Sequence, residues 1–214
     1  MRKTALSNYV IPALLIPVVA VGMIVLNMYD TDRDDALSDI SISSQEPIVI
    51  DGLVDHLDRP LTRSRFTNNW SFVFFGFTNC PDVCPVTLNQ LVAVNRAIKK
   101  RTDIEKDPTF YFVSVDPERD TKPRLAEYVG YFDSSFVGLT GEIEKLIKFE
   151  KQFDAYHRYG RKNSTGNYTV QHSAEVYLIN PAGNLIAKFT PPLDINTMVE
   201  QFATLVKRFN QAAV

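Results

Sequence analysis

The hydrophobic pattern after residue 70 alternates between buried strands and amphipathic helices. Continuous apolar runs at Ser71–Phe77 and Thr109–Val115 are typical of central strands that are buried on both faces. Between these two runs, apolar residues recur at helical spacing over Val86–Ile98. The same criteria predict further helices over Lys122–Phe132, Glu142–Phe153 and Asp194–Phe209, and shorter strands over Val137–Leu139, Ala174–Ile179 and Leu185–Phe189.

The order of these elements predicts a mixed sheet with helices on both faces. Residues 180–184, between the last two strands, include Gly183 and signal a hairpin turn. Asp120 or Thr121 is expected to cap the helix that begins at Lys122. The order is compatible with a thioredoxin-like α/β fold, although the pattern by itself does not single that fold out.

The N-terminal segment has a different character. No residue from Thr4 to Tyr29 is charged, and Val10–Leu26 is long and apolar enough for one transmembrane helix. Arg2 and Lys3 precede this stretch. Acidic residues follow it, namely Asp30, Asp32, Asp34 and Asp35. The positive-inside bias therefore predicts a cytoplasmic N-terminus, with the rest of the chain across the membrane.

These features predict three parts: an anchor at residues 1–29, an acidic, serine-containing linker at residues 30–46, and a globular domain at residues 47–214. A cleaved signal peptide is the alternative, since Val18–Ala20 is an acceptable cleavage site. Cleavage there would leave an exposed apolar tail, which favours an uncleaved anchor. The short N-terminus lacks an Arg-rich presequence. We therefore expect a single-pass protein of a bacterial inner membrane, with its domain in the periplasm.

Composition narrows the function. The chain has 214 residues, of which 45% are hydrophobic, and this suits one ordinary domain with a short appendage. The net charge is −2 and the isoelectric point is near 5.9, so nucleic acid is excluded as a partner class. Two cysteines are too few for a disulfide scaffold, and their closeness in sequence makes them one local site.

That site follows the first central strand and precedes a helix. The positive end of a helix dipole stabilises a thiolate at this place. Three residues separate Cys80 from Cys84, whereas thioredoxin-type redox motifs have two, so a soft metal ion has more room. Pro81 and Pro85 stiffen the loop. Two buried structural thiols are the simpler alternative, and the flanking prolines argue against it.

His172 is the candidate third ligand among the three histidines. It precedes the predicted strand Ala174–Ile179, whose start faces the cysteine loop in a thioredoxin-like sheet. Residues 169–175 contain no proline, where thioredoxins place a cis-proline, and this favours metal binding over disulfide exchange. For His56 and His157, an exposed or core-edge role is the expectation.

Two cysteines and one histidine suit copper in either oxidation state, because thiolates favour Cu(I) and imidazole helps to retain Cu(II). Zinc is the main competitor, and it usually needs a fourth ligand. Asp82 or Asp116 could supply that ligand. The donor chemistry alone therefore leaves zinc open.

Three motifs resemble those of the Sco/SenC family of copper chaperones, in the family's order: Phe75–Pro85, Val115–Thr121 and Tyr168–Ser173. The resemblance covers residues 47–209 and extends to the N-terminal anchor. It implies a thioredoxin-like domain that binds one copper ion, Cu(I) or Cu(II), through Cys80, Cys84 and His172.

The resemblance also implies a role in assembling the binuclear copper centre of cytochrome c oxidase subunit II. An upstream copper donor and a thiol reductant protein would be further partners. Gln171 stands where the family commonly has Asp, so a carboxylate that could orient the imidazole is missing. Asp82, Asp116 and Gln171 are candidates for a supporting or docking role, although Asp116 also fits an ordinary strand-to-helix turn.

Two other functions are open. Cys80 and Cys84 could form a redox-active disulfide and reduce the cysteines of the acceptor, a thiol–disulfide oxidoreductase activity. Residues 77–81 also resemble peroxiredoxins faintly, although no proline sits just upstream of Thr78. The chain is not expected to be an enzyme unless the reductase activity applies.

Overall fold

The computed structural model describes residues 21, 23, 37, 40 and 46–212. The chain divides into two compact units, Met1–Asp39 and Ile40–Val214, and every element described below belongs to the second. The predicted anchor and linker lie almost entirely outside the described residues. Within the described part of the chain, no helix is both long and apolar enough to cross a bilayer.

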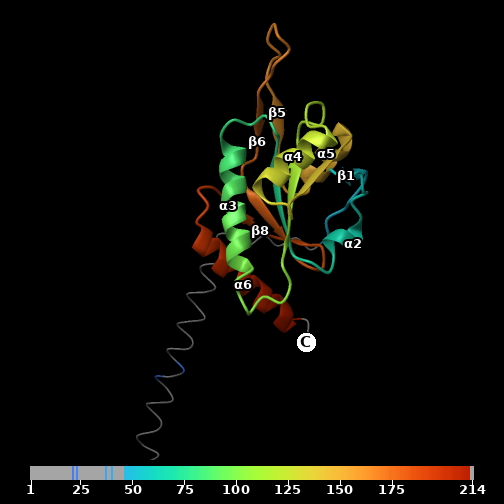
Figure 1. Ribbon diagram of the computed structural model, residues 1–214. Helices are drawn as coiled ribbons and strands as arrows, with labels where there is room; N and C mark the ends of the chain where they lie inside the picture. The colour runs from blue at the N-terminus through green and yellow to red at the C-terminus, as the bar shows by residue number, and fades with distance from the viewer. Residues whose placement is uncertain (1–20, 22, 24–36, 38–39, 41–45, 213–214) are drawn as a thin grey trace, which may run out of the picture. The chain divides into compact units, whose positions relative to one another are not determined.

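A six-stranded mixed sheet forms the centre of this unit, in the order β1-β4-β3-β2-β7-β8 (Figure 1). Its strands are β1 (Leu53–Asp55), β2 (Ser71–Gly76), β3 (Thr109–Ser114), β4 (Val137–Gly141), β7 (Val176–Ile179) and β8 (Leu185–Phe189). The helices are α2 (Arg63–Phe66), α3 (Val83–Ile98), α4 (Lys122–Phe132), α5 (Ile143–Lys151) and α6 (Ile195–Ala212). Strands β2, β3 and β4 run parallel, so α3 and α4 serve as the crossover connections between them.

One face of the sheet is covered by α3, α4 and α6. Phe72 of β2 packs against Phe202 of α6, with ring centroids 5.2 Å apart. Phe112 of β3 packs against Tyr128 of α4 at 5.4 Å. Figure 1 shows α3 and α6 side by side along this face. The helices close this face because alternate strand residues present aromatic rings to it.

The other face of the sheet is covered by α5 and α2. Phe75 of β2 packs against Phe149 of α5, and Phe149 also meets Phe66 of α2 edge to face. All six residues of β2 are buried. The predictions of a central strand buried on both faces, and of helices on both sides of a mixed sheet, are therefore confirmed.

A separate two-stranded hairpin projects from this body (Figure 1). It consists of β5 (His157–Tyr159) and β6 (Val170–His172), which pair antiparallel with His157 opposite His172. The sequence pattern placed His172 just before a sheet strand. In the structure His172 instead ends its own short strand, and the sheet strand β7 starts at Val176.

Two further differences from the sequence-based boundaries matter for the site. Helix α3 begins at Val83 instead of Val86, so Cys84 lies in its first turn. Pro85 permits this, because the first helical turn needs no backbone N–H from it. The strands β1, β5 and β6 and the helix α2 were missed, since three or four residues are too few to show a period.

Candidate metal centre

Cys80 and Cys84 lie where the chain passes from β2 into α3. Cys80 is half-buried in the connecting loop, and Cys84 is fully buried in the first turn of the helix. The backbone N–H of Cys84 donates to Cys80 Sγ at 3.4 Å. The start of α3 thus stabilises negative charge on Cys80, as the position of the motif predicted.

Gly76, the last residue of β2, makes room for Cys84. A Cβ atom at this position would lie 2.8 Å from Cys84 Sγ and 2.6 Å from the ring of Phe112. Both distances are shorter than real Cβ contacts allow. The absence of a side chain at Gly76 therefore lets the buried sulfur sit against the end of the central strand.

His172 reaches the cysteines from the hairpin. Its Nδ1 lies 2.7 Å from the carbonyl oxygen of Ser173, so this nitrogen carries the proton and donates it. His172 Nε2 lies 3.4 Å from Cys84 Sγ, and in the neutral form of the ring this nitrogen carries the lone pair that can bind a metal ion. The rings of Phe77 and Phe74 flank the imidazole. The main chain itself therefore aims Nε2 at the sulfurs.

The structure brings the three predicted ligands together. One ligand atom each from Cys80, Cys84 and His172 lies within 4.8 Å of the other two. Among the described residues, this is the one group of such side chains that could hold a metal ion. A cavity of about 670 Å³ opens beside it, between the cysteine loop and residues 168–172 of the hairpin. The group is accessible from this side.

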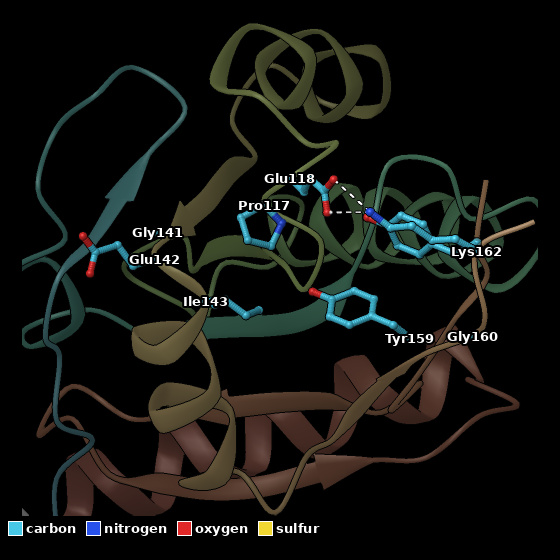
Figure 2. Close-up of a pocket in the computed structure, with 9 residues that line it drawn as sticks. Pro117, Glu118, Gly141, Glu142, Ile143, Tyr159, Gly160 and Lys162 are labelled. Atoms are coloured by element: carbon cyan, nitrogen blue, oxygen red, sulfur yellow. Dashed lines mark hydrogen bonds and ion pairs between the residues drawn. The ribbon is translucent and has the colours of Figure 1, made fainter. Parts of the chain in front are cut away.

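A second cavity, of about 510 Å³, lies around the hairpin, the loop before α4 and the turn before α5 (Figure 2). Figure 2 shows Glu118 and Lys162 bridging part of it, and none of the three ligand residues lines it. Tyr168 lines both cavities, so the base of the hairpin separates them. The metal chemistry therefore belongs to the first cavity.

The two thiols differ in acidity. A hydrogen bond from the Cys84 thiol, helped by His172 and backbone N–H groups, lowers the pKa of Cys80 to about 3. The bond to the Cys80 thiolate, together with burial, raises the pKa of Cys84. Without metal, Cys80 is therefore the thiolate and Cys84 the neutral thiol.

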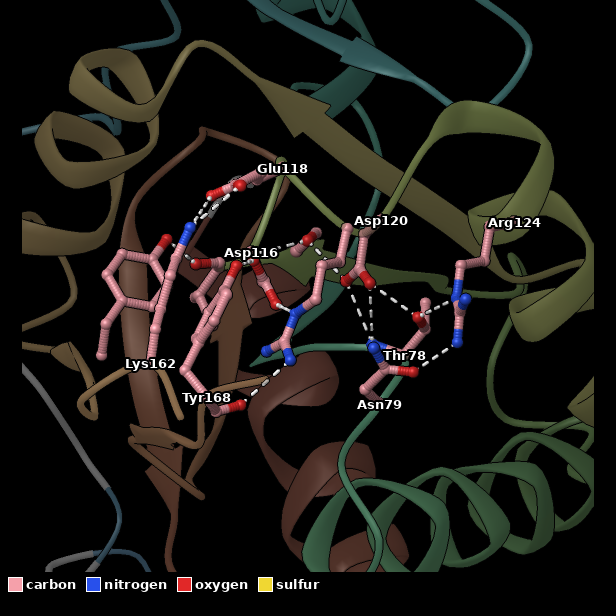
Figure 3. Close-up of polar contacts among 12 residues, drawn as sticks. Thr78, Asn79, Asp116, Glu118, Asp120, Arg124, Lys162 and Tyr168 are labelled. Atoms are coloured by element: carbon pink, nitrogen blue, oxygen red, sulfur yellow. Dashed lines mark hydrogen bonds and ion pairs between the residues drawn. The ribbon is translucent and has the colours of Figure 1, made fainter. Parts of the chain in front are cut away.

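The hairpin that carries His172 is held by the buried carboxylate of Asp116 (Figure 3). Tyr168 Oη donates to this carboxylate at 2.7 Å, and Arg119 Nε donates to it at 2.5 Å. Arg119 also donates to the carbonyl oxygen of Tyr168 and stacks 3.7 Å above its ring. Asp116 thus ties the hairpin to the loop that follows β3, and it is engaged too fully to serve as a fourth metal ligand.

The cysteine loop is held by a second buried carboxylate, Asp120. It accepts hydrogen bonds from the backbone N–H and hydroxyl of Thr78 and from the hydroxyl of Ser114 (Figure 3). Burial raises the pKa of Asp120 even though these bonds oppose the shift. Asp120 or Thr121 was expected to cap this helix. Thr121 takes the N-cap position but makes no side-chain capping bond, and the Asp120 carboxylate bonds to the cysteine loop instead.

The remaining candidate residues lie outside the three-residue group. Asp82 is exposed at the start of α3, and Gln171 is exposed on β6 beside the cavity. His56 accepts a hydrogen bond from the Gly138 backbone. For His157 an exposed or core-edge role was expected; its side chain is buried, and its Nδ1 bonds to the buried carboxylate of Glu150 at 2.7 Å. The holding roles of Arg119 and Tyr168 were not foreseen, although both fall within the motifs that the sequence singled out.

A family model described as SCO1/SenC matches residues 52–207, which is more than half of the chain. The chain belongs to the SCO1/SenC family. Its three-residue group, its mixed sheet and its projecting hairpin are therefore features of a Sco-type thioredoxin-like domain.

Individual relatives agree with this assignment. The chain is 35% identical over 162 residues to "Protein SCO2 homolog, mitochondrial" of Danio rerio, covering 73% of this chain and 56% of that protein. The chain thus spans little more than half the length of that relative. The crystal structure of Arabidopsis thaliana ScoI with copper bound matches with a TM-score of 0.69 and 29% identity, covering 76% and 98% of the two chains. The structure of Bradyrhizobium japonicum ScoI with copper bound matches with a TM-score of 0.63 and 30% identity, covering 78% and 99%.

The acidity difference predicts selective alkylation. In the reduced, metal-free protein at pH 5, iodoacetamide should modify Cys80 and leave Cys84 unmodified, because only Cys80 is both accessible and a thiolate. Peptide mass spectrometry would locate the label. In denaturant the two cysteines should react equally slowly at this pH. Equal modification in the folded protein would contradict the assignment.

The holding role of Asp116 predicts a local effect on the hairpin. Asp116→Asn should lower the free energy of opening at the Gly160 and Ser173 amides by about 3 kcal/mol, the lower end of the range for a broken buried pair, because Arg119 is left uncompensated. Residue-resolved hydrogen exchange would measure it. The matched control is Glu118→Gln, which removes only the exposed pair with Lys162 and should cost at most about 0.5 kcal/mol. Equal effects of the two substitutions would refute the role.

Proposed function

We propose that this chain is a copper chaperone that delivers copper to the binuclear copper centre of cytochrome c oxidase subunit II. The observation that carries the proposal is the convergence of two sulfurs and the Nε2 atom of an imidazole within 4.8 Å beside an open cavity, with the other ring nitrogen bonded to a main-chain carbonyl. Membership of the SCO1/SenC family supports it, and the two structures named above are of copper-bound Sco proteins.

The ligand set favours copper over zinc. Cu(I) accepts two thiolates and one imidazole, and the imidazole also helps to hold Cu(II). Zinc usually takes four ligands, and within the described residues the group contains three. Asp116 is bound by Arg119 and Tyr168, so it does not complete a zinc site. One copper ion per chain follows from this arrangement.

Delivery of Cu(I) needs no change of oxidation state. A deprotonated acceptor cysteine binds the ion while His172 and then the cysteines release it. The metal therefore passes between soft ligands without being free in solution. The accessible side of the site, where Cys80 and His172 line the cavity, is where an acceptor cysteine can approach. An upstream copper donor would load the site by the reverse exchange.

A thiol–disulfide oxidoreductase is the second candidate, and the acidity difference of the thiols favours it. The Cys80 thiolate would attack an acceptor disulfide and form a mixed disulfide. Cys84 would then displace the reduced acceptor, lose its proton and leave a Cys80–Cys84 disulfide. A thiol reductant protein would have to restore the two thiols. Both roles require reduced cysteines at the start, so they can operate in sequence.

We also propose the three-part organisation given by the sequence. Residues 1–29 anchor the chain in a bacterial inner membrane, residues 30–46 form the linker, and residues 47–214 form the periplasmic copper-binding domain. The uncharged segment between basic and acidic flanks supports the anchor and its orientation. A domain in the periplasm would be in the same compartment as the upstream copper donor.

Substitution of His172 distinguishes the two candidate functions, because copper binding needs this side chain and disulfide exchange does not. His172→Ala should abolish stable Cu(II) binding and weaken Cu(I) binding, because the third ligand is lost, yet leave a reducible Cys80–Cys84 disulfide. Cys80→Ser or Cys84→Ser should abolish tight Cu(I) binding and the disulfide together. Copper stoichiometry, competition titration with a Cu(I) chelator and thiol counting would measure these effects.

His56→Gln is the matched control, since His56 lies outside the ligand group and should retain wild-type copper binding. In cells, His172→Ala should impair oxidase assembly, with partial rescue by added copper. Normal oxidase with His172→Ala but none with Cys80→Ser would move the function to the reductase.

The topology has its own test. A reporter fused after Val214 should be active outside the cytoplasm, and the full-length chain should resist alkaline and high-salt extraction from membranes, because an uncleaved apolar helix stays in the bilayer. A soluble periplasmic protein that lacks its first residues would show that the segment is a cleaved signal peptide.

A further inference from the structure

Strand β6 has an open edge. In the β5–β6 ladder, the Ser173 N–H donates to the Tyr156 carbonyl and the Gly160 N–H donates to the Thr169 carbonyl. Gln171 lies between these positions and faces Arg158 in the register. Because backbone groups alternate in direction along a strand, those of Val170 and His172 point away from β5. Among the described strands, none pairs with β6 on that side.

This open edge faces the metal-site cavity. The carbonyl of Tyr168, which also points away from β5, is taken by Arg119 Nη1 at 3.0 Å. Beyond Tyr168 the cavity is lined by Val170 and His172 on one side and by the cysteine loop, including Cys80, on the other. An extended segment that entered here would therefore run along β6, beside the cavity that Cys80 and His172 line.

The solvent-facing side of the β5–β6 hairpin carries a positive charge, Arg158 of β5, that no acidic side chain among the described residues balances. Gln171 lines the cavity and is exposed, and its cross-strand neighbour is the exposed Arg158. Directly opposed side chains lie about 5 Å apart at Cβ, so Arg158 stands next to the cavity rim. Gln171 is neutral, and within the described residues Arg158 forms no ion pair with Asp or Glu.

We propose that the copper acceptor docks as an extended segment that adds a strand to the open edge of β6, places its cysteine beside Cys80 and His172, and pairs an acidic residue with Arg158. Strand addition suits this place, because main-chain hydrogen bonds supply affinity and alternate side chains supply specificity. The proposal rests on the proposed function for the role of the cysteine, whereas the docking itself rests on the edge and the charge.

The occupant follows from geometry and charge. A strand paired with β6 would lie about 4.8 Å from it, on the side where the cavity is lined by Cys80. Successive side chains of that strand would alternate between the ligand sulfurs and the solvent side of Arg158. The acceptor segment therefore carries a cysteine facing inward and, at a neighbouring position, an Asp or Glu facing Arg158.

The test uses a probe that cannot bind metal or exchange disulfides. The peptide acetyl-Thr-Val-Val-Asp-Ser-Thr-Val-Thr-amide is added to the reduced, metal-free full-length chain in detergent, with Ser standing for the acceptor cysteine. Residue-resolved hydrogen exchange should show slower exchange at the Val170 and His172 amides. The Gln171 amide already faces β5 and should keep its rate.

Charge and backbone controls sharpen the test. Arg158→Gln should weaken peptide binding about three- to fivefold, as for an exposed ion pair. Arg161→Gln removes the same charge from the hairpin tip, away from the cavity lining, and should leave binding unchanged. N-methylation of one alternating set of peptide amides should abolish binding, and methylation of the other set should be tolerated.

The proposal fails if Val170 and His172 gain no protection, if Arg158→Gln and Arg161→Gln act equally, or if protection appears at the second cavity around Gly141 and Tyr159 instead. Because the probe and the protein are free of copper, failure here leaves the copper assignment intact. Loss of copper binding in the ligand variants would likewise leave the docking result standing.

Discussion

Two buried carboxylates at the end of β3 hold the parts of this site in place. Asp116 and Asp120 are 0% and 1% exposed, and an unpaired buried carboxylate is costly. Each must therefore be satisfied by donors from elsewhere in the fold. Asp120 takes its donors mainly from the cysteine loop through Thr78, and Asp116 takes its donors from Arg119 and from Tyr168 of the hairpin.

This arrangement fixes two segments that are far apart in sequence at one end of the sheet. Cys80 and His172 are brought to the same cavity because their segments are tied to neighbouring residues of a single loop. The ligand atoms themselves make few other bonds, so the scaffold, and not the metal, supplies most of the organisation. Such a site could bind an ion and still release it, which is what the proposed copper delivery requires.

The hairpin combines two tasks that oppose each other. Its base must be rigid, since His172 Nε2 has to face the sulfurs, and the bonds to Asp116 and Glu150 provide this. Its edge along Val170 and His172 remains open toward the cavity, where a partner can approach. Gln171 adds no charge at this place, so Arg158 is left for a partner to neutralise. Rigidity and accessibility are thus divided between different residues of one short element.

The sequence by itself determined the central strands, the main helices and the choice of the three candidate ligand residues. Long periodic segments such as Thr109–Val115 are set by local burial, and the cysteine spacing is a local property of the chain. The sequence also identified residues 115–121 as a motif, but it did not show whether Asp116 has a supporting role at the site or only forms a strand-to-helix turn.

The tertiary structure decided what that motif does. Tyr168 is hydrogen-bonded to Arg119 and to Asp116, which lie 49 and 52 positions away in the sequence, and no periodicity reports such contacts. The short strands β5 and β6 exist only because they pair with each other and are held by that network. The protonation of His172 and the opposite acidities of Cys80 and Cys84 depend on atoms a few ångströms away in space, which the order of residues does not specify.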